Sequence, residues 1–145
     1  MRFLVSLWSS VSAVLDLTCS ARSLTHAGVK SIRIHENGGP EKLVFEDIPV
    51  PAPAAGEIRL RVEAAGLNFI DTYKRSGLYA VALPHTLGQE AAGVVTAVGA
   101  GVVDFRVGDR VASAAVTGAC AEEALAPAAQ CVPVPAGVSS QLAAA

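Results

Sequence analysis

One segment of the chain alternates strictly between apolar and charged residues, and this pattern constrains the fold more than any other feature. Every second position in residues 57–65 is apolar, namely Ile58, Leu60, Val62 and Ala64. The positions between them are charged, namely Arg59, Arg61 and Glu63. A period of two places successive side chains on opposite faces of a β-strand. We therefore expect residues 57–65 to form a half-buried strand.

Glycine and proline punctuate the rest of the chain. The 13 glycines and 8 prolines favour short strands and turns over long helices. Further short strands are expected at residues 29–35, 43–45 and 91–98 and within residues 104–112, and the strand region ends at residues 131–135. The best helix candidate is residues 68–76, with Gly77 placed to cap its C-terminus. Ser139 or Ser140 is positioned to cap a second helix starting at Gln141.

The composition excludes several classes of protein. The chain has 145 residues, of which 52% are hydrophobic and 17% charged, so it is a single globular domain rather than a disordered segment. The net charge of −2 and the absence of a basic cluster argue against nucleic acid as a partner. No apolar run approaches the eighteen or so residues that a membrane span requires. An odd number of cysteines, 3, without a Cys-x-x-Cys pair fits a reducing, cytoplasmic environment.

Residues 1–28 differ from the rest and are interpreted as an extension. A basic start, an apolar stretch and small residues near Cys19 are typical of a secretory signal, although Asp16 interrupts the apolar stretch. Serines and arginines also fit an organellar presequence, which would place the protein in an organelle. The third interpretation is an extension from a start codon assigned too far upstream. All three remain open, and no function is assigned to these residues.

Three motifs occur in a fixed order after the alternating strand. They are residues 66–71 (GLNFID), 88–95 (GQEAAGVV) and 107–111 (VGDRV). Together they resemble the N-terminal GroES-like domain of the medium-chain dehydrogenase/reductase superfamily. The longer string at residues 67–79 (LNFIDTYKRSGLY) is similar to the zinc-independent NADPH:quinone oxidoreductases of the ζ-crystallin type. The resemblance spans about residues 30–145.

The resemblance implies a mainly β fold, a GroES-like partly open β-barrel with a few short helices. It divides the chain into the extension at 1–28, the GroES-like domain at 29–138, and the start of a truncated helix at 139–145. The Rossmann domain that holds most of the NADPH in this family is absent from the chain, so we expect a fragment of a longer enzyme. The complete family enzymes are expected to be homodimers.

Two positions indicate that the domain works without zinc. In the zinc alcohol dehydrogenases, a cysteine occupies the position of Asn68 and a histidine that of Gln89. An amide is a poor substitute for a thiolate or an imidazole as a zinc ligand. Glu90 remains, but one carboxylate alone does not hold the metal. No metal site is therefore expected.

Site residues are carried over from the resemblance. Without a Lewis acid, hydrogen bonds must polarise the substrate oxygen, and Asn68 and Tyr73 offer an amide and a phenol as catalytic donors. The cofactor-binding residues implied by the family are Phe69, Ile70, Asp71, Thr72 and Tyr73, beside the nicotinamide half of NADPH. The other interpretation of Asn68 is a helix cap, and that of Phe69 is a core residue. Tyr79 is a further candidate at the substrate mouth.

Two other features are given no catalytic role. Residues 99–104 begin like a dinucleotide fingerprint, but the third glycine and a following helix are missing, so a hairpin turn is expected. His85, which follows Pro84, is interpreted as a loop residue.

The function implied is hydride transfer from NADPH to a quinone or an α,β-unsaturated carbonyl compound. The chain alone is expected to be inactive and to bind NADPH weakly or not at all, because the nucleotide-binding domain is missing. The alternative is a non-catalytic GroES-like module that acts through protein contacts only. A co-chaperonin is disfavoured, because residues 68–79 have no role there.

Overall fold

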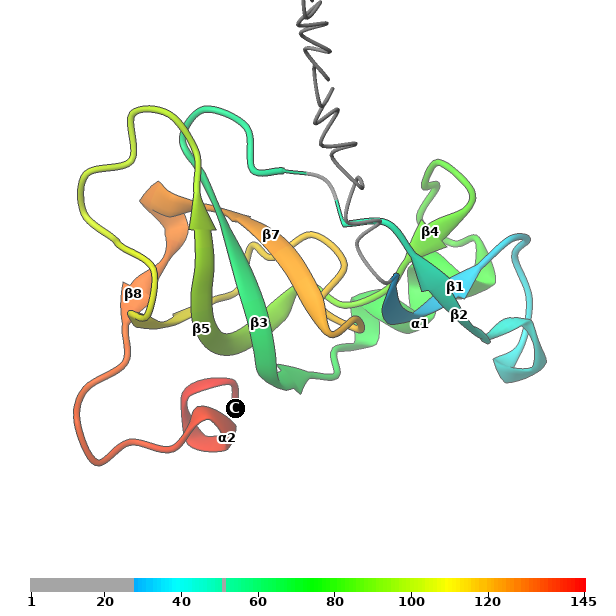
Figure 1. Cartoon of the computed structure of the whole chain (residues 1–145). Coiled ribbons are helices and arrows are strands. Elements are labelled where there is room, and N and C mark those ends of the chain that lie inside the picture. The colour runs from blue at the N-terminus through cyan, green and yellow to red at the C-terminus, as the bar shows by residue number, and fades with distance from the viewer. Residues whose placement is uncertain (1–27, 51) are drawn as a thin grey trace, which may run out of the picture.

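The computed structural model describes residues 28–50 and 52–145, and its strands form two open antiparallel sheets (Figure 1). The larger sheet has the order β7-β3-β5-β6-β8, with β3 at Glu57–Gly66, β5 at Glu90–Val98, β6 at Arg110–Ser113, β7 at Glu123–Pro127 and β8 at Val132–Pro133. The smaller has the order β2-β1-β4, with β1 at Val29–Ile34, β2 at Val44–Ile48 and β4 at His85–Thr86. The remaining elements are α1 (Phe69–Ser76), α2 (Ser140–Ala143) and the 3₁₀ turns η1 (Pro40–Lys42) and η2 (Ala128–Gln130).

The expected mainly β fold with few short helices is confirmed, and the two sheets are not closed into a barrel. The smaller sheet and α1 lie to one side of the larger sheet, and α2 lies near the end of β3 (Figure 1). The expected extension falls almost wholly on residues 1–27, which lie outside the described residues. Within the described ranges, no helix has the length and apolarity needed to cross a bilayer.

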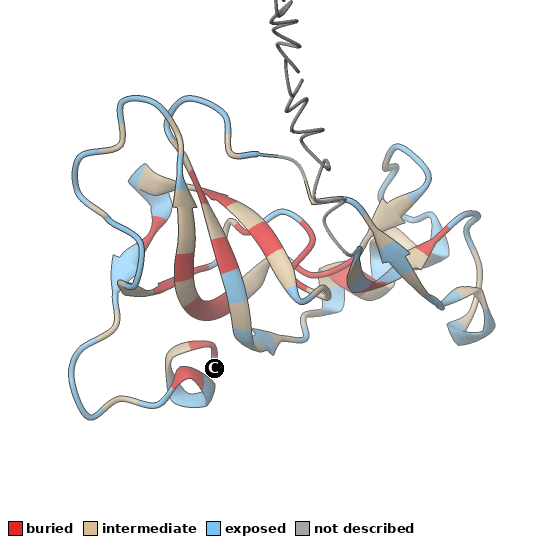
Figure 2. Ribbon diagram, in the orientation of Figure 1, coloured by how far each residue is buried: buried red, intermediate tan, exposed pale blue. Residues whose placement is uncertain are grey.

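The core of the larger sheet is built on the alternating strand. Ile58 and Leu60 of β3 are fully buried, as the period of two predicts. Figure 2 shows the buried residues continuing onto the neighbouring strands β5 and β7. Their buried partners are mostly small or β-branched, namely Ala91, Val95, Val111, Val116, Ala119, Ala124, Ala126 and Cys131. The core of the larger sheet is thus assembled around β3 and its neighbours β5 and β7.

The pairing of β3 with β5 brings two of the sequence motifs together. Gly66, at the end of β3, is opposite Glu90, at the start of β5. Gly93 allows the strands to approach closely, because a Cβ there would collide with the carbonyl oxygen of Arg61. The loop before α1 therefore lies directly beside the segment that begins at Gly88.

Two strands are not anticipated by the sequence pattern. β7 reads Glu-Ala-Leu-Ala-Pro, which is poor in β-branched residues, and its place at the sheet edge is fixed by pairing with β3. β4 includes His85, so the loop interpretation of this residue is wrong: it pairs with Ile34 of β1. The hairpin interpretation of residues 99–104 agrees with the structure, since the connection from β5 to β6 contains no helix and the strands pair antiparallel.

The second helix is fastened to the sheet through Ser140. Ser139 is the N-cap and its Oγ accepts a hydrogen bond from Leu142 N at 3.1 Å, so α2 begins one residue before the expected Gln141. The buried Ser140 Oγ donates to Glu63 Oε2 at 2.7 Å, and this bond holds the pKa of Glu63 below its usual value. Arg110 donates to the Val138 carbonyl at 2.8 Å. The four residues of α2 are thereby held against β3 and β5.

Candidate active site

A buried carboxylate holds the start of α1 in place. Asp71 is 1% exposed, and its Oδ2 accepts the backbone N–H of the N-cap residue Asn68 at 3.1 Å. Its Oδ1 accepts the backbone N–H of Gly88 at 2.9 Å. Such a capping contact satisfies a donor at the helix terminus and fixes how the chain enters the helix. The Asp71 side chain therefore ties α1 to the Gly88 segment, and its expected contact with a cofactor stays a prediction.

The amide of Asn68 is oriented by a second carboxylate. Asn68 Nδ2 donates to Glu90 Oε2 at 2.8 Å. Glu90 reaches this position because Gly66, opposite it in the sheet, has no side chain; a Cβ on Gly66 would lie 2.5 Å from Glu90 Oε2. One N–H of the amide is thus committed to Glu90, and the side-chain oxygen faces the backbone N–H of Asp71 in a capping box. The other N–H remains available for further contacts.

Three aromatic side chains form a row along α1 and the loop after it. Phe69 and Tyr73 stack with their ring centroids 6.5 Å apart and an interplanar angle of 26°. Tyr73 and Tyr79 meet edge to face at 5.5 Å. The three side chains are 79%, 37% and 50% exposed, respectively. The core interpretation of Phe69 is therefore wrong: this aromatic row (Phe69, Tyr73 and Tyr79) faces solvent.

The other expected site residues are distributed around the same helix. Ile70 is half-buried, and Thr72 donates its hydroxyl to the Phe69 carbonyl at 2.7 Å. In the described part of the chain, no hydrogen bond joins the side chains of Asn68 and Tyr73. Gly77 ends the helix in the left-handed conformation, with φ of 88°, as expected from the sequence. The helix thus presents Asn68, Phe69, Thr72 and Tyr73 at its surface and buries Asp71.

A pocket that the sequence did not indicate lies between α1 and the loop after β6. Lys74 Nζ donates to Gln89 Oε1 at 3.3 Å at its edge. Its volume is about 260 Å³, and it is lined by Lys74, His85, Gly88, Gln89 and residues 114–118. Burial, with the nearby charge of Lys74, lowers the pKa of His85 and favours the neutral imidazole. We call this cavity the Lys74 pocket.

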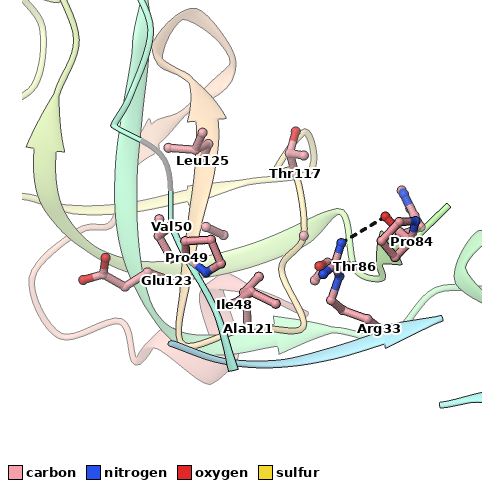
Figure 3. A pocket seen from close by; sticks show the side chains of 13 residues that line it. Arg33, Ile48, Pro49, Val50, Pro84, Thr86, Thr117, Ala121, Glu123 and Leu125 are labelled. Atoms are coloured by element: carbon pink, nitrogen blue, oxygen red, sulfur yellow. Dashed lines mark hydrogen bonds between the residues drawn. The ribbon is translucent and has the colours of Figure 1, made fainter. Parts of the chain in front are cut away.

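A second pocket of about 260 Å³ lies between the smaller sheet and β7 (Figure 3). Its walls are mostly apolar and include Ile48, Pro49 and Leu125. Arg33 is its cation, but the guanidinium donates to the Pro84 carbonyl at 3.1 Å (Figure 3). It also donates to Glu46 at 3.4 Å. No residue of α1 lines this pocket, so it is separate from the expected site residues.

The residues at the two zinc-ligand positions are engaged as amides. Asn68 donates to Glu90, and Gln89 accepts from Lys74. Among residues 28–50 and 52–145, no three His, Cys, Asp or Glu side chains converge in a way that could hold a metal ion. Zinc independence remains a prediction, which metal analysis tests below.

Comparison with known proteins gives a consistent set of matches. The model of the alcohol dehydrogenase GroES-like domain matches residues 54–137. The chain is 55% identical to a quinone oxidoreductase of Pseudomonas aeruginosa over 86 residues, covering 59% of this chain and 26% of the relative. It is 45% identical to a 2-haloacrylate reductase of Burkholderia over 112 residues, covering 70% of this chain and 32% of that protein.

The folds agree as well. The structure superimposes on the Escherichia coli quinone oxidoreductase complexed with NADPH with a TM-score of 0.77 and 43% identity, covering 79% of this chain and 36% of that one. The chain thus spans between about a quarter and a third of the length of these two curated relatives.

Proposed function

The chain belongs to the alcohol dehydrogenase GroES-like domain family, and on this premise we propose that it is the substrate-side domain of an NADPH-dependent oxidoreductase that works without zinc. The substrate class is a quinone or an α,β-unsaturated carbonyl compound. Similarity to proteins named quinone oxidoreductase supports the first, and similarity to a protein named 2-haloacrylate reductase supports the second. The relatives are about three to four times longer than the match, so a nucleotide-binding domain is part of the proposal.

The observation that carries the proposal is the aromatic row beside the Asn68 amide. Large apolar side chains exposed next to an oriented polar group are typical of a ligand-binding surface. Phe69 and Tyr73 offer ring faces that fit a planar nicotinamide, and Ile70 and Thr72 border them on the same helix. NADPH, when bound, supplies a hydride.

The chain's own residues then stabilise charge on the substrate oxygen. As the substrate accepts a hydride, negative charge develops on its oxygen, and fixed hydrogen-bond donors stabilise that charge. Asn68 has one N–H left after its bond to Glu90, and Tyr73 has a phenol on a partly exposed ring. We assign these two residues as the catalytic donors.

A non-catalytic module acting through protein contacts is the second candidate. It is favoured by two apolar side chains beside the aromatic row, because Leu67 is 83% exposed and Leu78 is 68% exposed. A module of this kind needs the apolar surface but has no use for an oriented amide. The two candidates therefore differ in whether replacing the Asn68 amide lowers activity.

A fusion experiment tests the proposed function. The chain alone and the chain fused to a nucleotide-binding domain of a quinone oxidoreductase are assayed for NADPH oxidation with a quinone and with an enone. We expect negligible turnover from the chain alone and measurable turnover from the fusion. Turnover by the chain alone would disprove the missing-domain argument. A correctly folded fusion that binds NADPH but reduces neither substrate would favour the second candidate.

Metal analysis of the same samples tests zinc independence. We expect substoichiometric zinc that a chelator removes without loss of activity. One tightly held zinc per chain would contradict the assignment of Asn68 and Gln89 as amides in a metal-free site.

In the cell, we propose that the protein is cytoplasmic and that the complete enzyme is a homodimer.

A further inference from the structure

Lys74 carries a charge that the described fold does not neutralise. The side chain is half-buried between α1 and the Gly88 segment, and its contact is the neutral oxygen of Gln89 at 3.3 Å. Among the described residues, no carboxylate forms an ion pair with the Lys74 ammonium. Other lysines differ in this respect: Lys30 pairs with Asp47 at 2.6 Å and Lys42 with Glu36 at 2.7 Å.

The surroundings of the Lys74 pocket do not supply the missing charge. Asp71 lies nearby, but its two oxygens are held by the backbone N–H groups of Asn68 and Gly88. His85, which also lines the pocket, has a pKa lowered by burial and therefore favours its neutral form. Arg33 lines the neighbouring pocket, where its guanidinium donates to the Pro84 carbonyl (Figure 3) and pairs with Glu46. Lys74 is therefore the cation of this pocket that remains available to a ligand.

The size and walls of the pocket restrict the ligand. About 260 Å³ is below the range of roughly 300–1,000 Å³ typical of sites for drug-sized ligands. Ala114, Ala115 and Val116 give the lining of the pocket an apolar part. A small molecule with one anionic group and a short apolar body fits this combination.

We propose that the Lys74 pocket binds the carboxylate of a small acid with a short apolar body, with Lys74 as the counter-ion of that carboxylate. This inference goes beyond the proposed function and does not depend on it, because the pocket is lined by Lys74 and Gln89 but by none of Asn68, Phe69 and Tyr73.

A binding titration on the full chain tests the proposal without nucleotide or turnover. The ¹⁵N-labelled protein is titrated with 2-butenoate and, separately, with 2-butenamide, which has nearly the same size and no charge. We expect 2-butenoate to shift the amide signals of Gly88, Gln89 and Gly118 saturably, with a Kd of about 1–10 mM. The uncharged amide should bind about tenfold more weakly, because it lacks the charge-assisted bond to Lys74.

Variants of Lys74 and Lys42 distinguish binding in the pocket from a general effect of the protein's charge. Lys74→Met should weaken 2-butenoate binding about tenfold, whereas Lys74→Arg should retain most of it. Lys42→Met is the matched control, because it removes a lysine paired with Glu36 outside the pocket, and it should bind as the unmodified chain does. The same spectra show whether each variant is folded.

Three results would overturn the proposal: equal affinity for the acid and the amide, unchanged binding by a folded Lys74→Met variant, or tighter binding of inorganic phosphate than of 2-butenoate. The comparison of the acid with the amide needs no variant, so the proposal can be overturned even if Lys74→Met fails to fold. If the titration fails, the fusion assay with a quinone still decides the proposed function. If the fusion assay fails, carboxylate binding by the chain is still measured.

Discussion

Gly66 and Glu90 lie opposite each other in the β3–β5 ladder, and the Glu90 side chain occupies the space that a side chain on Gly66 would need. The same space is bordered by the Ala144 carbonyl oxygen, 2.9 Å from where a Cβ on Gly66 would lie. This one position therefore joins the sheet, the carboxylate that orients Asn68, and the end of the short helix α2.

Gly66→Ala should destabilise the domain by about 1–3 kcal/mol, because the added methyl group forces Glu90 or α2 to move. Urea denaturation followed by far-UV circular dichroism measures the effect. In a Glu90→Ala background the same substitution should cost less, since the nearest clash is with Glu90 Oε2. An equal loss of free energy of unfolding in the two backgrounds would mean that Glu90 is not the reason why residue 66 must be glycine.

Asp71→Ala should lower the free energy of unfolding by about 2–3 kcal/mol, because it leaves the backbone N–H groups of Asn68 and Gly88 without their acceptor. Thermal unfolding measures this as a lower Tm. Asp104→Ala is the matched control, since Asp104 is exposed, and it should leave Tm nearly unchanged. Similar Tm values for the two variants would show that the buried carboxylate does not hold α1.

In the fusion enzyme, Asn68→Ala and Tyr73→Phe should each lower kcat about tenfold or more, the effect of losing about 1.4 kcal/mol of stabilisation of the developing charge. Tyr79→Phe removes a hydroxyl from the same aromatic row and should change kcat by less than about twofold. Full activity of both Asn68→Ala and Tyr73→Phe would show that these residues serve only as cap and packing residues.

The stability of the domain should fall as the pH drops below about 6.5, the ordinary pKa of histidine. Burial lowers the pKa of His85 in the folded state. Between this lowered pKa and about pH 6.5, the unfolded chain therefore binds a proton at His85 that the folded chain does not bind. The contribution of the neutral His85 to the free energy of unfolding is therefore complete above about pH 6.5. It declines below that pH and is lost once the pH is below the lowered pKa. His85→Gln should remove this decline, which urea unfolding at pH 7.5 and 5.5 would detect. A difference between the two proteins that is independent of pH would contradict it.

The sequence predicted the elements better than the contacts between them. The period of two identified β3, and the position of Gly77 identified the end of α1, because both signals are local. The contacts of Asn68 with Glu90 and of Lys74 with Gln89 join residues 22 and 15 positions apart, and only the β3–β5 register brings them together. A strand of two residues has no period to recognise, so the sequence pattern does not distinguish β4 from a loop.

The edge-to-face contact of Tyr73 with Tyr79 also gives the molecule an optical reporter. The chain contains 2 tyrosines, both in this contact, and 1 tryptophan, Trp8. In a Trp8→Phe variant, all phenol emission and most of the near-ultraviolet dichroism therefore originate from the aromatic row. A ligand reaching Tyr73 would change that signal directly, so occupancy of the proposed site could be followed by spectroscopy without any label.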